Sequence, residues 1–207
     1  MTTLSKQKST QLRDVYGDPP VARALLGDVR WSWIWLILRL YLGYEWLSAG
    51  WEKLTGGWMG ATAGTALTGF VKGALTKATG AHPDVQGFYA AFLQSVVLPN
   101  AAAWSYVVAW GEFLVGVGLV LGLFTGIAAF FGGFMNANYL LAGTVSTNPI
   151  LFIIEIFIIL AWKTAGWWGL DRWVLPALGT PWRPGSIFEH TEAEPGRETG
   201  ALPAQSK

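Results

Sequence analysis

Ionisable and amide side chains interrupt the apolar stretches of this sequence, and they are the residues most able to form a functional site. These residues are Arg39, Glu45, Glu112, Asn136, Asn138 and Glu155. Each charged side chain at the middle of a membrane helix costs roughly 2.5–3.5 kcal/mol, so such residues turn toward one another or toward a polar cavity. Successive membrane helices cross the bilayer in opposite directions. If residues are counted from the ends of the apolar segments on that basis, Arg39, Glu112, Asn136 and Glu155 fall at a similar depth in the membrane. We expect their side chains to meet.

Three carboxyl groups against one arginine predict a proton-handling or ligand-polarising pocket. They cannot all be ionised in a medium of low dielectric constant without a large penalty, so at least one of Glu45, Glu112 and Glu155 is expected to be protonated. Glu112 and Glu155 are the candidate catalytic groups, as proton donors and acceptors. The candidate ligand-binding residues are Arg39, Asn136, Glu45, Asn138 and Lys53. The alternative is a structural Arg–Glu clamp that holds the helices in register.

Composition excludes several classes of protein. The chain has 207 residues, 52% of them hydrophobic and only 13% charged, whereas soluble domains are about a quarter charged. The absence of Cys excludes thiol catalysis, Fe–S clusters and Cys-type zinc sites by this chain alone. His82 and His190 lie outside the apolar runs, and no metal site is expected. A net charge of +1 gives no broad field for nucleic acid. The lipid bilayer is the expected environment.

Four apolar segments are long enough to be membrane helices, which need about 20 residues. They are Trp31–Trp51, Ala102–Leu123, Gly126–Ala142 and Pro149–Trp168. The loop between the first two, about residues 52–100, carries two apolar stripes at helical spacing, separated by Thr79–Pro83. The expected fold is all-α: a four-helix transmembrane bundle with two amphipathic helices in a long extracytoplasmic loop.

The distribution of basic residues predicts the orientation. Lys and Arg are frequent in residues 1–30 and again after the fourth segment, so both termini are expected in the cytoplasm. We divide the chain into a cytoplasmic segment 1–30, a membrane domain 31–182 and a tail 183–207. The tail is rich in Glu, Pro, Gly and Thr, which predicts disorder.

Several motifs resemble the DoxX/DoxD family over residues 31–182. They are Arg39-x-x-x-Gly43, Gly50-x-x-Lys53-Leu54, Glu112-x-x-x-Gly116, Gly122-Leu123-Phe124-Thr125 and Asn136-x-Asn138-Tyr139, the last followed by Ser146–Pro149. The resemblance is closest to the DoxD-like branch, which is annotated after the membrane subunit of thiosulfate:quinone oxidoreductase. It implies a multi-pass protein of a prokaryotic inner membrane that works with quinone and with partner subunits.

Two functional hypotheses follow. In the first, the chain is the quinone-facing subunit of an enzyme that oxidises sulfur compounds such as thiosulfate. Arg39 or Asn136 would polarise a quinone carbonyl and Glu112 or Glu155 would deliver protons. In the second, the chain is a non-catalytic structural or accessory subunit of a larger membrane redox complex. A small transporter is a minor third reading, because the sequence lacks the inverted repeats typical of transporters.

Overall fold

The computed structural model describes residues 18–180, and every regular element in that range is helical. Residues 1–17 and 181–207 lie outside it, so the expected disorder of the tail 183–207 falls outside the described residues. The α-helices are α1 (Pro20–Gly27), α2 (Ser32–Thr55), α3 (Thr65–Thr76), α4 (Gly87–Phe92), α5 (Ala101–Leu121), α6 (Thr125–Leu141), α7 (Asn148–Leu160), α8 (Trp162–Ala165) and α9 (Asp171–Ala177). Short 3₁₀ turns are η1 (Val29–Trp31), η2 (Gly60–Thr62) and η4 (Leu98–Asn100), and η3 (Leu93–Val97) is a π-helical turn.

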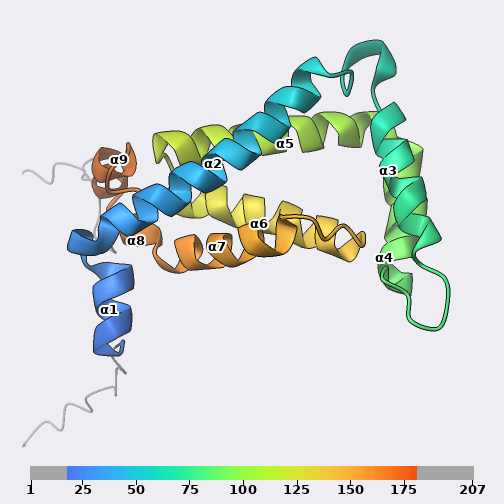
Figure 1. The fold of residues 1–207 in the computed structure, drawn as a ribbon. Helices are drawn as coiled ribbons and strands as arrows, with labels where there is room; N and C mark the ends of the chain where they lie inside the picture. The colour runs from blue at the N-terminus through green and yellow to red at the C-terminus, as the bar shows by residue number, and fades with distance from the viewer. Residues whose placement is uncertain (1–17, 181–207) are drawn as a thin grey trace, which may run out of the picture.

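Four long helices, α2, α5, α6 and α7, lie side by side and form the body of the molecule (Figure 1). Helix α2 packs along α5, and α6 packs along α7. Their starts and ends agree with the first three apolar segments to within a few residues, and α2 continues for four residues past Trp51 to Thr55. The helical assignments for these three segments are therefore confirmed.

Glycines allow α2 and α5 to approach closely. A Cβ on Gly50 would collide with the backbone of Phe113, and one on Gly116 would collide with the backbone of Leu47. On α2, the side chains of Arg39 and Trp46 share the buried face with Gly50. Arg39, Trp46 and Gly50 follow one another at intervals of seven and four residues, which keeps them on one face of the helix.

The fourth apolar segment is not one continuous helix. Helix α7 ends at Leu160, α8 begins at Trp162, and the chain then turns through Gly166 and Gly169 into α9. The expected helix Pro149–Trp168 is therefore wrong beyond Leu160. Helix α1 lies in segment 1–30, where no helix was predicted, and it contacts α8. The hydroxyl of Thr164 in α8 donates to the Leu26 carbonyl at 3.1 Å. This contact fixes the chain after the break.

Helices α3 and α4 stand across the opposite end of the bundle (Figure 1). They confirm the two amphipathic helices predicted between the first and second segments. They have their own apolar core, with Leu67, Val71, Val85, Tyr89 and Leu93 all buried. The ammonium of Lys77 donates to the Gly143 carbonyl at 2.6 Å and ties the end of α3 to the end of α6.

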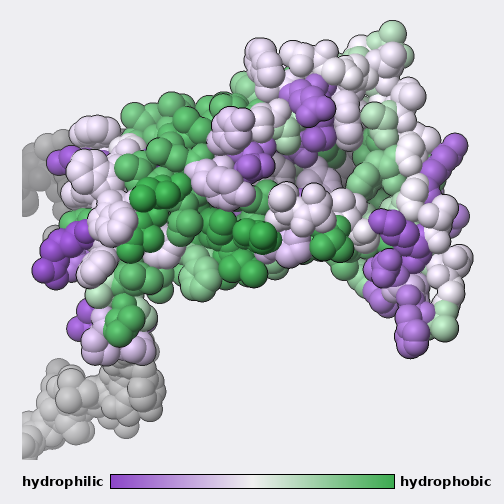
Figure 2. Space-filling model, viewed as in Figure 1, coloured by the Kyte–Doolittle hydropathy of each residue, from purple (hydrophilic) through white to green (hydrophobic). Residues whose placement is uncertain are grey.

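The surface of the bundle suits a lipid environment. Figure 2 shows a broad hydrophobic band over the long helices, with hydrophilic residues gathered toward the two ends. Within residues 18–180, one helical run, Gly87–Leu121, is by its length and composition able to cross a membrane, and a third of its apolar window is buried. Helix α7 is strongly apolar but has 13 residues, or about 20 Å of helix.

Candidate functional site

A cavity of about 380 Å³ lies among α2, α5, α6 and the start of α7, toward the α3 end of the bundle. Four of the residues predicted from the sequence lie in its wall: Glu45, Lys53, Glu112 and Asn136. The remaining wall has aromatic, hydroxyl or amide, and aliphatic side chains: Trp46, Trp58, Phe70, Tyr139, Thr144, Ser146, Thr147, Asn148, Ala49, Leu67, Val108 and Leu151. Cavities of this size, with a few convergent polar groups, are typical of small-molecule sites.

Glu112 forms one polar cluster in this wall. Its carboxyl group is buried, and Oε2 lies 2.6 Å from the ammonium of Lys53. The hydroxyl of Tyr139 donates to Oε1 at 2.5 Å. Lys53 lies 5.2 Å from the centre of the Trp58 ring and keeps 20% of its side chain exposed. The cluster joins α2, α5 and α6.

Glu155 forms a second polar cluster with a different composition. Its side chain is fully buried, and its two oxygens accept hydrogen bonds from Trp46 Nε1 at 2.7 Å and from Asn136 Nδ2 at 2.8 Å. Gly132 leaves room for this carboxyl, because a Cβ there would lie 2.7 Å from Oε1. Among residues 18–180, no cation lies within ion-pair distance of Glu155.

The two clusters are neighbours with unlike electrostatics. The rings of Trp46 and Tyr139 stack with centroids 6.4 Å apart, and each ring carries a donor to one of the two glutamates. Glu112 has a cation beside it, whereas Glu155 has two neutral donors. Pairs of carboxyl groups in unlike environments are the usual basis for separating proton donor from proton acceptor. The buried Oδ1 of Asn136 has no hydrogen-bond partner among the described residues, which leaves an acceptor near the cavity.

Tyr139 belongs to this site, although it was not among the residues predicted for it. Tyr139 is three residues after Asn136, so the two residues lie on one face of α6. Since Asn136 was identified, the same spacing argument could have found Tyr139. Asn138, which was predicted as a ligand-binding residue, lies outside the wall of this cavity. Its Oδ1 accepts from the Tyr89 hydroxyl at 3.0 Å and helps to fasten α4 to α6.

Arg39 is not in this site, and the expectation that it meets Glu112 and Glu155 at one depth is wrong. Its guanidinium donates to the carbonyls of Leu119 at 2.7 Å and Val120 at 3.3 Å. Leu119 is seven residues, or about 10 Å, further along α5 than Glu112. The last carbonyls of a helix have no partners within it, and the long Arg39 side chain reaches them. Lys53 takes the place beside Glu112 that the sequence analysis gave to Arg39.

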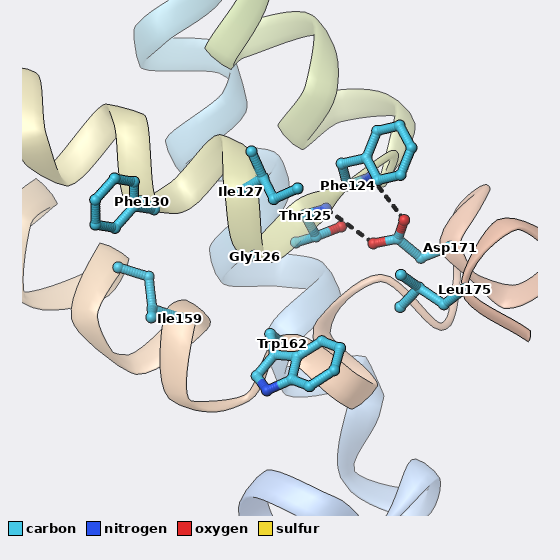
Figure 3. A pocket seen from close by; sticks show the side chains of 9 residues that line it. All are labelled: Phe124, Thr125, Gly126, Ile127, Phe130, Ile159, Trp162, Asp171 and Leu175. Atoms are coloured by element: carbon cyan, nitrogen blue, oxygen red, sulfur yellow. Dashed lines mark hydrogen bonds between the residues drawn. The ribbon is translucent and has the colours of Figure 1, made fainter. Parts of the chain in front are cut away.

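Asp171 binds the other side of the turn between α5 and α6, at the start of α6. Its Oδ1 accepts from the backbone nitrogen of Phe124 at 2.6 Å, and its Oδ2 accepts from that of Thr125 at 2.9 Å (Figure 3). Arg39 therefore places positive charge at the C-terminus of α5, and Asp171 places negative charge at the N-terminus of α6. Both charges complement the helix dipoles, and they give this end of the bundle a structural role.

An apolar groove of about 590 Å³ runs between α5 and α6. The wall of this groove includes Leu114, Ile127, Phe131 and Phe134, which are all more than half exposed. The groove therefore opens on the hydrophobic surface of the long helices. Val108 and Tyr139 belong to the wall of this groove and also to the wall of the polar cavity. The polar cavity and the apolar groove are therefore adjacent.

The family model of DoxX matches residues 34–143, which is more than half of the chain. The chain belongs to the DoxX family. No curated protein and no solved structure matches it. The DoxX region includes Arg39, Lys53, Glu112, Asn136 and Tyr139, and it stops before Glu155 and Asp171. Membership identifies a membrane-associated protein of a family often linked to oxidoreductase function, in agreement with the hydrophobic surface.

Proposed function

We propose that the polar cavity binds the ring of a membrane quinone, and that this chain is the quinone-facing subunit of an oxidoreductase acting on sulfur compounds such as thiosulfate. The observation that carries the proposal is the adjacency of a polar cavity and an apolar groove that share Val108 and Tyr139. A quinone has the matching shape, with a small ring bearing two carbonyls and a long hydrocarbon tail. The ring would occupy the cavity, and the tail would lie in the groove.

The residues of the cavity can supply what a quinone ring needs during reduction. Reduction to the quinol consumes two electrons and two protons. The Tyr139 hydroxyl and the Lys53 ammonium, both bonded to Glu112, are donors able to stabilise negative charge developing on a carbonyl oxygen. Glu112 would accept and return protons through them. Tyr139 and Lys53 thus take the polarising role that was predicted for Arg39 or Asn136.

Glu155 would act on the quinone indirectly, through the residues that line the cavity. Trp46 and Asn136 both line the cavity and both donate to Glu155, so a change in its protonation would alter the groups that face the ring. Oxidation of the sulfur compound is assigned to a partner subunit, because the chain has no Cys to form a persulfide. That partner would provide the two electrons.

The proposed setting is a prokaryotic inner membrane crossed by all four long helices, with both termini in the cytoplasm. The exposed apolar side chains of the long helices support this arrangement, because Ile37, Leu114, Phe134 and Ile153 on α2, α5, α6 and α7 are each more than half exposed. Helices α3 and α4 would then cover the extracytoplasmic end, where the polar cavity lies.

The experiment that tests the proposal is substitution of Glu112 and Tyr139 in the purified native complex. Tyr139→Phe keeps the ring and removes one donor, whereas Glu112→Gln keeps the size of the side chain and removes its charge. We expect quinone reduction to fall by about 10²-fold in each variant, as loss of a proton-transfer group usually causes. Glu52→Gln, on the exposed side of α2, is the matched control and should retain full activity.

A non-catalytic accessory role is the second candidate, and one observation favours it. The Glu112 cluster joins α2, α5 and α6, while the Glu155 cluster joins α2, α6 and α7, so both could serve only to hold the bundle together. In that case Tyr139→Phe would lower the melting temperature of the complex but leave its turnover unchanged. The same result would reject the quinone site.

A further inference from the structure

Two hollows adjoin at the end of the bundle opposite the quinone site proposed above. The first, of about 270 Å³, lies among α6, α7 and α9, and Figure 3 shows Phe130, Ile159, Trp162 and Leu175 arranged around it. Phe130 and its neighbour Ile127 are more than half exposed, so this hollow opens on the hydrophobic surface. Gly126 permits the close contact of Trp162 with α6, because a Cβ there would lie 2.7 Å from Trp162 Cβ.

The second hollow, of about 160 Å³, has the polar side chains Lys163, Arg172 and Thr180 in its wall, beside the apolar Trp167 and Pro176. It shares Asp171 and Leu175 with the first hollow. Lys163 and Arg172 are exposed, and neither lies within ion-pair distance of a carboxylate in the part of the chain that the structure describes.

Tryptophans surround these two cations. The Lys163 ammonium lies 5.8 Å from the Trp162 ring centre, and the Arg172 guanidinium lies 5.1 Å from that of Trp167 and 6.0 Å from that of Trp173. Tryptophan and basic residues at the end of a membrane helix typically lie at the level of the lipid head groups.

The carboxylate of Asp171 does not neutralise the positive charge of Lys163 and Arg172 in the second hollow. Asp171 is 3% exposed, and its two oxygens accept hydrogen bonds from the backbone nitrogens of Phe124 and Thr125, at the start of α6. Its negative charge is therefore directed at the N-terminus of α6 and offset by the helix dipole. Lys163 and Arg172 remain as the charges that a bound molecule would meet.

We propose that the two hollows together form a binding site for one anionic phospholipid. An acyl chain would lie in the apolar hollow between Phe130 and Leu175, and the phosphate would lie between Lys163 and Arg172. Arginine binds phosphate through two parallel hydrogen bonds, and lysine adds a point charge. The adjoining apolar hollow selects a lipid over free phosphate, and the pair of cations selects an anionic head group over a zwitterionic one.

The test uses the full chain, purified in detergent, delipidated and titrated with phosphatidylglycerol, phosphatidylcholine or inorganic phosphate, with bound molecules counted by native mass spectrometry. We expect one phosphatidylglycerol per chain, bound at least tenfold more tightly than phosphatidylcholine and not displaced by millimolar phosphate. The double variant Lys163→Gln/Arg172→Gln should lose tenfold or more in affinity for phosphatidylglycerol. Leu175→Trp, which fills the apolar hollow, should weaken the binding of both lipids.

The matched control removes the same charge elsewhere. Arg23→Gln/Lys72→Gln takes two exposed cations from α1 and α3, and it should bind phosphatidylglycerol like the unmodified chain. An equal loss in this control, or equal affinity for the two lipids, would overturn the proposal. Displacement of the lipid by phosphate, with unchanged binding in Leu175→Trp, would show a phosphate site and would also overturn it. None of these outcomes depends on the quinone site.

Discussion

At the scale of single residues, four charged side chains within residues 18–180 form two groups at separate positions. Lys53 and Glu112 pair beside the polar cavity, whereas Arg39 and Asp171 bind the two helix ends at the α5–α6 turn. The residue types alone suggested one arginine shared among glutamates. The structure replaces that view with an ion pair in the cavity and a pair of helix caps about 10 Å further along α5.

Asp171 is predicted to stabilise the bundle through its cap on α6. Asp171→Ala leaves the backbone nitrogens of Phe124 and Thr125 without acceptors, and it should cost about 1–2 kcal/mol, the usual value of such a cap. Thermal unfolding in detergent, followed by tryptophan fluorescence, measures the loss as a fall of several degrees in the midpoint. The exposed Asp18→Ala is the control and should melt with the unmodified chain.

Lysine is predicted not to replace Arg39 without a loss of stability. A lysine cannot span the carbonyls of Leu119, Val120 and Trp168 with one ammonium, whereas the planar guanidinium contacts all three. Arg39→Lys should lower the unfolding free energy by about 2 kcal/mol, because hydrogen bonds from charged groups are lost in a buried place. Arg30→Lys, on an exposed pair with Asp28, should change it little. Equal effects at the two positions would contradict the role given to Arg39.

At the scale of elements, the contact between α2 and α5 depends on glycines. Gly50→Ala should destabilise the chain by about 1–3 kcal/mol or more, because the new methyl group meets the Phe113 backbone and the helices must separate. Gly73→Ala on α3 is the matched control, since a Cβ there meets nothing within 4 Å. It should stabilise the chain by up to about 1 kcal/mol through helix propensity. Opposite signs of the two melting shifts are the expected result.

The break between α7 and α8 is a second feature of the elements. Helix α7 alone is about 20 Å long, which is less than the hydrocarbon thickness of a bilayer. The chain after Leu160 continues through α8 and places Trp162, Lys163 and Trp167 around the two hollows of the proposed lipid site. A continuous helix to Trp168 would have carried these side chains past the end of α6.

At the scale of the whole molecule, the proposed orientation can be tested by chemical labelling, because the chain contains no Cys. Single cysteines replace Val21 on α1, Thr79 in the turn after α3, and Phe134 on the exposed face of α6. In intact cells a membrane-impermeant maleimide should label Thr79→Cys alone. Val21→Cys should react only after the membrane is opened, and Phe134→Cys should resist labelling in both conditions. Labelling of Val21→Cys in intact cells would reverse the proposed orientation.

The sequence by itself determined the first three long helices, the helices α3 and α4 between the first two of them, and the polar residue types of the site. Composition and helical periodicity are local properties, so the apolar segments and the two apolar stripes, now seen around Leu67 and Tyr89, could be identified without a structure. Glu112 and Glu155 could be identified for the same reason, since a carboxyl group in an apolar run is visible in the sequence alone.

Only the tertiary structure decided which of these groups meet. The similar depth of the four polar residues was predicted by counting from the ends of the apolar segments. That count could not take account of the extra length of α2, the break in the helix after Leu160 or the reach of a long side chain. Arg39 therefore binds carbonyls at the end of α5, and Lys53 reaches Glu112 from the last turn of α2. Partner choice depends on helix crossing and on where unpaired backbone groups lie, and both arise only when the helices pack.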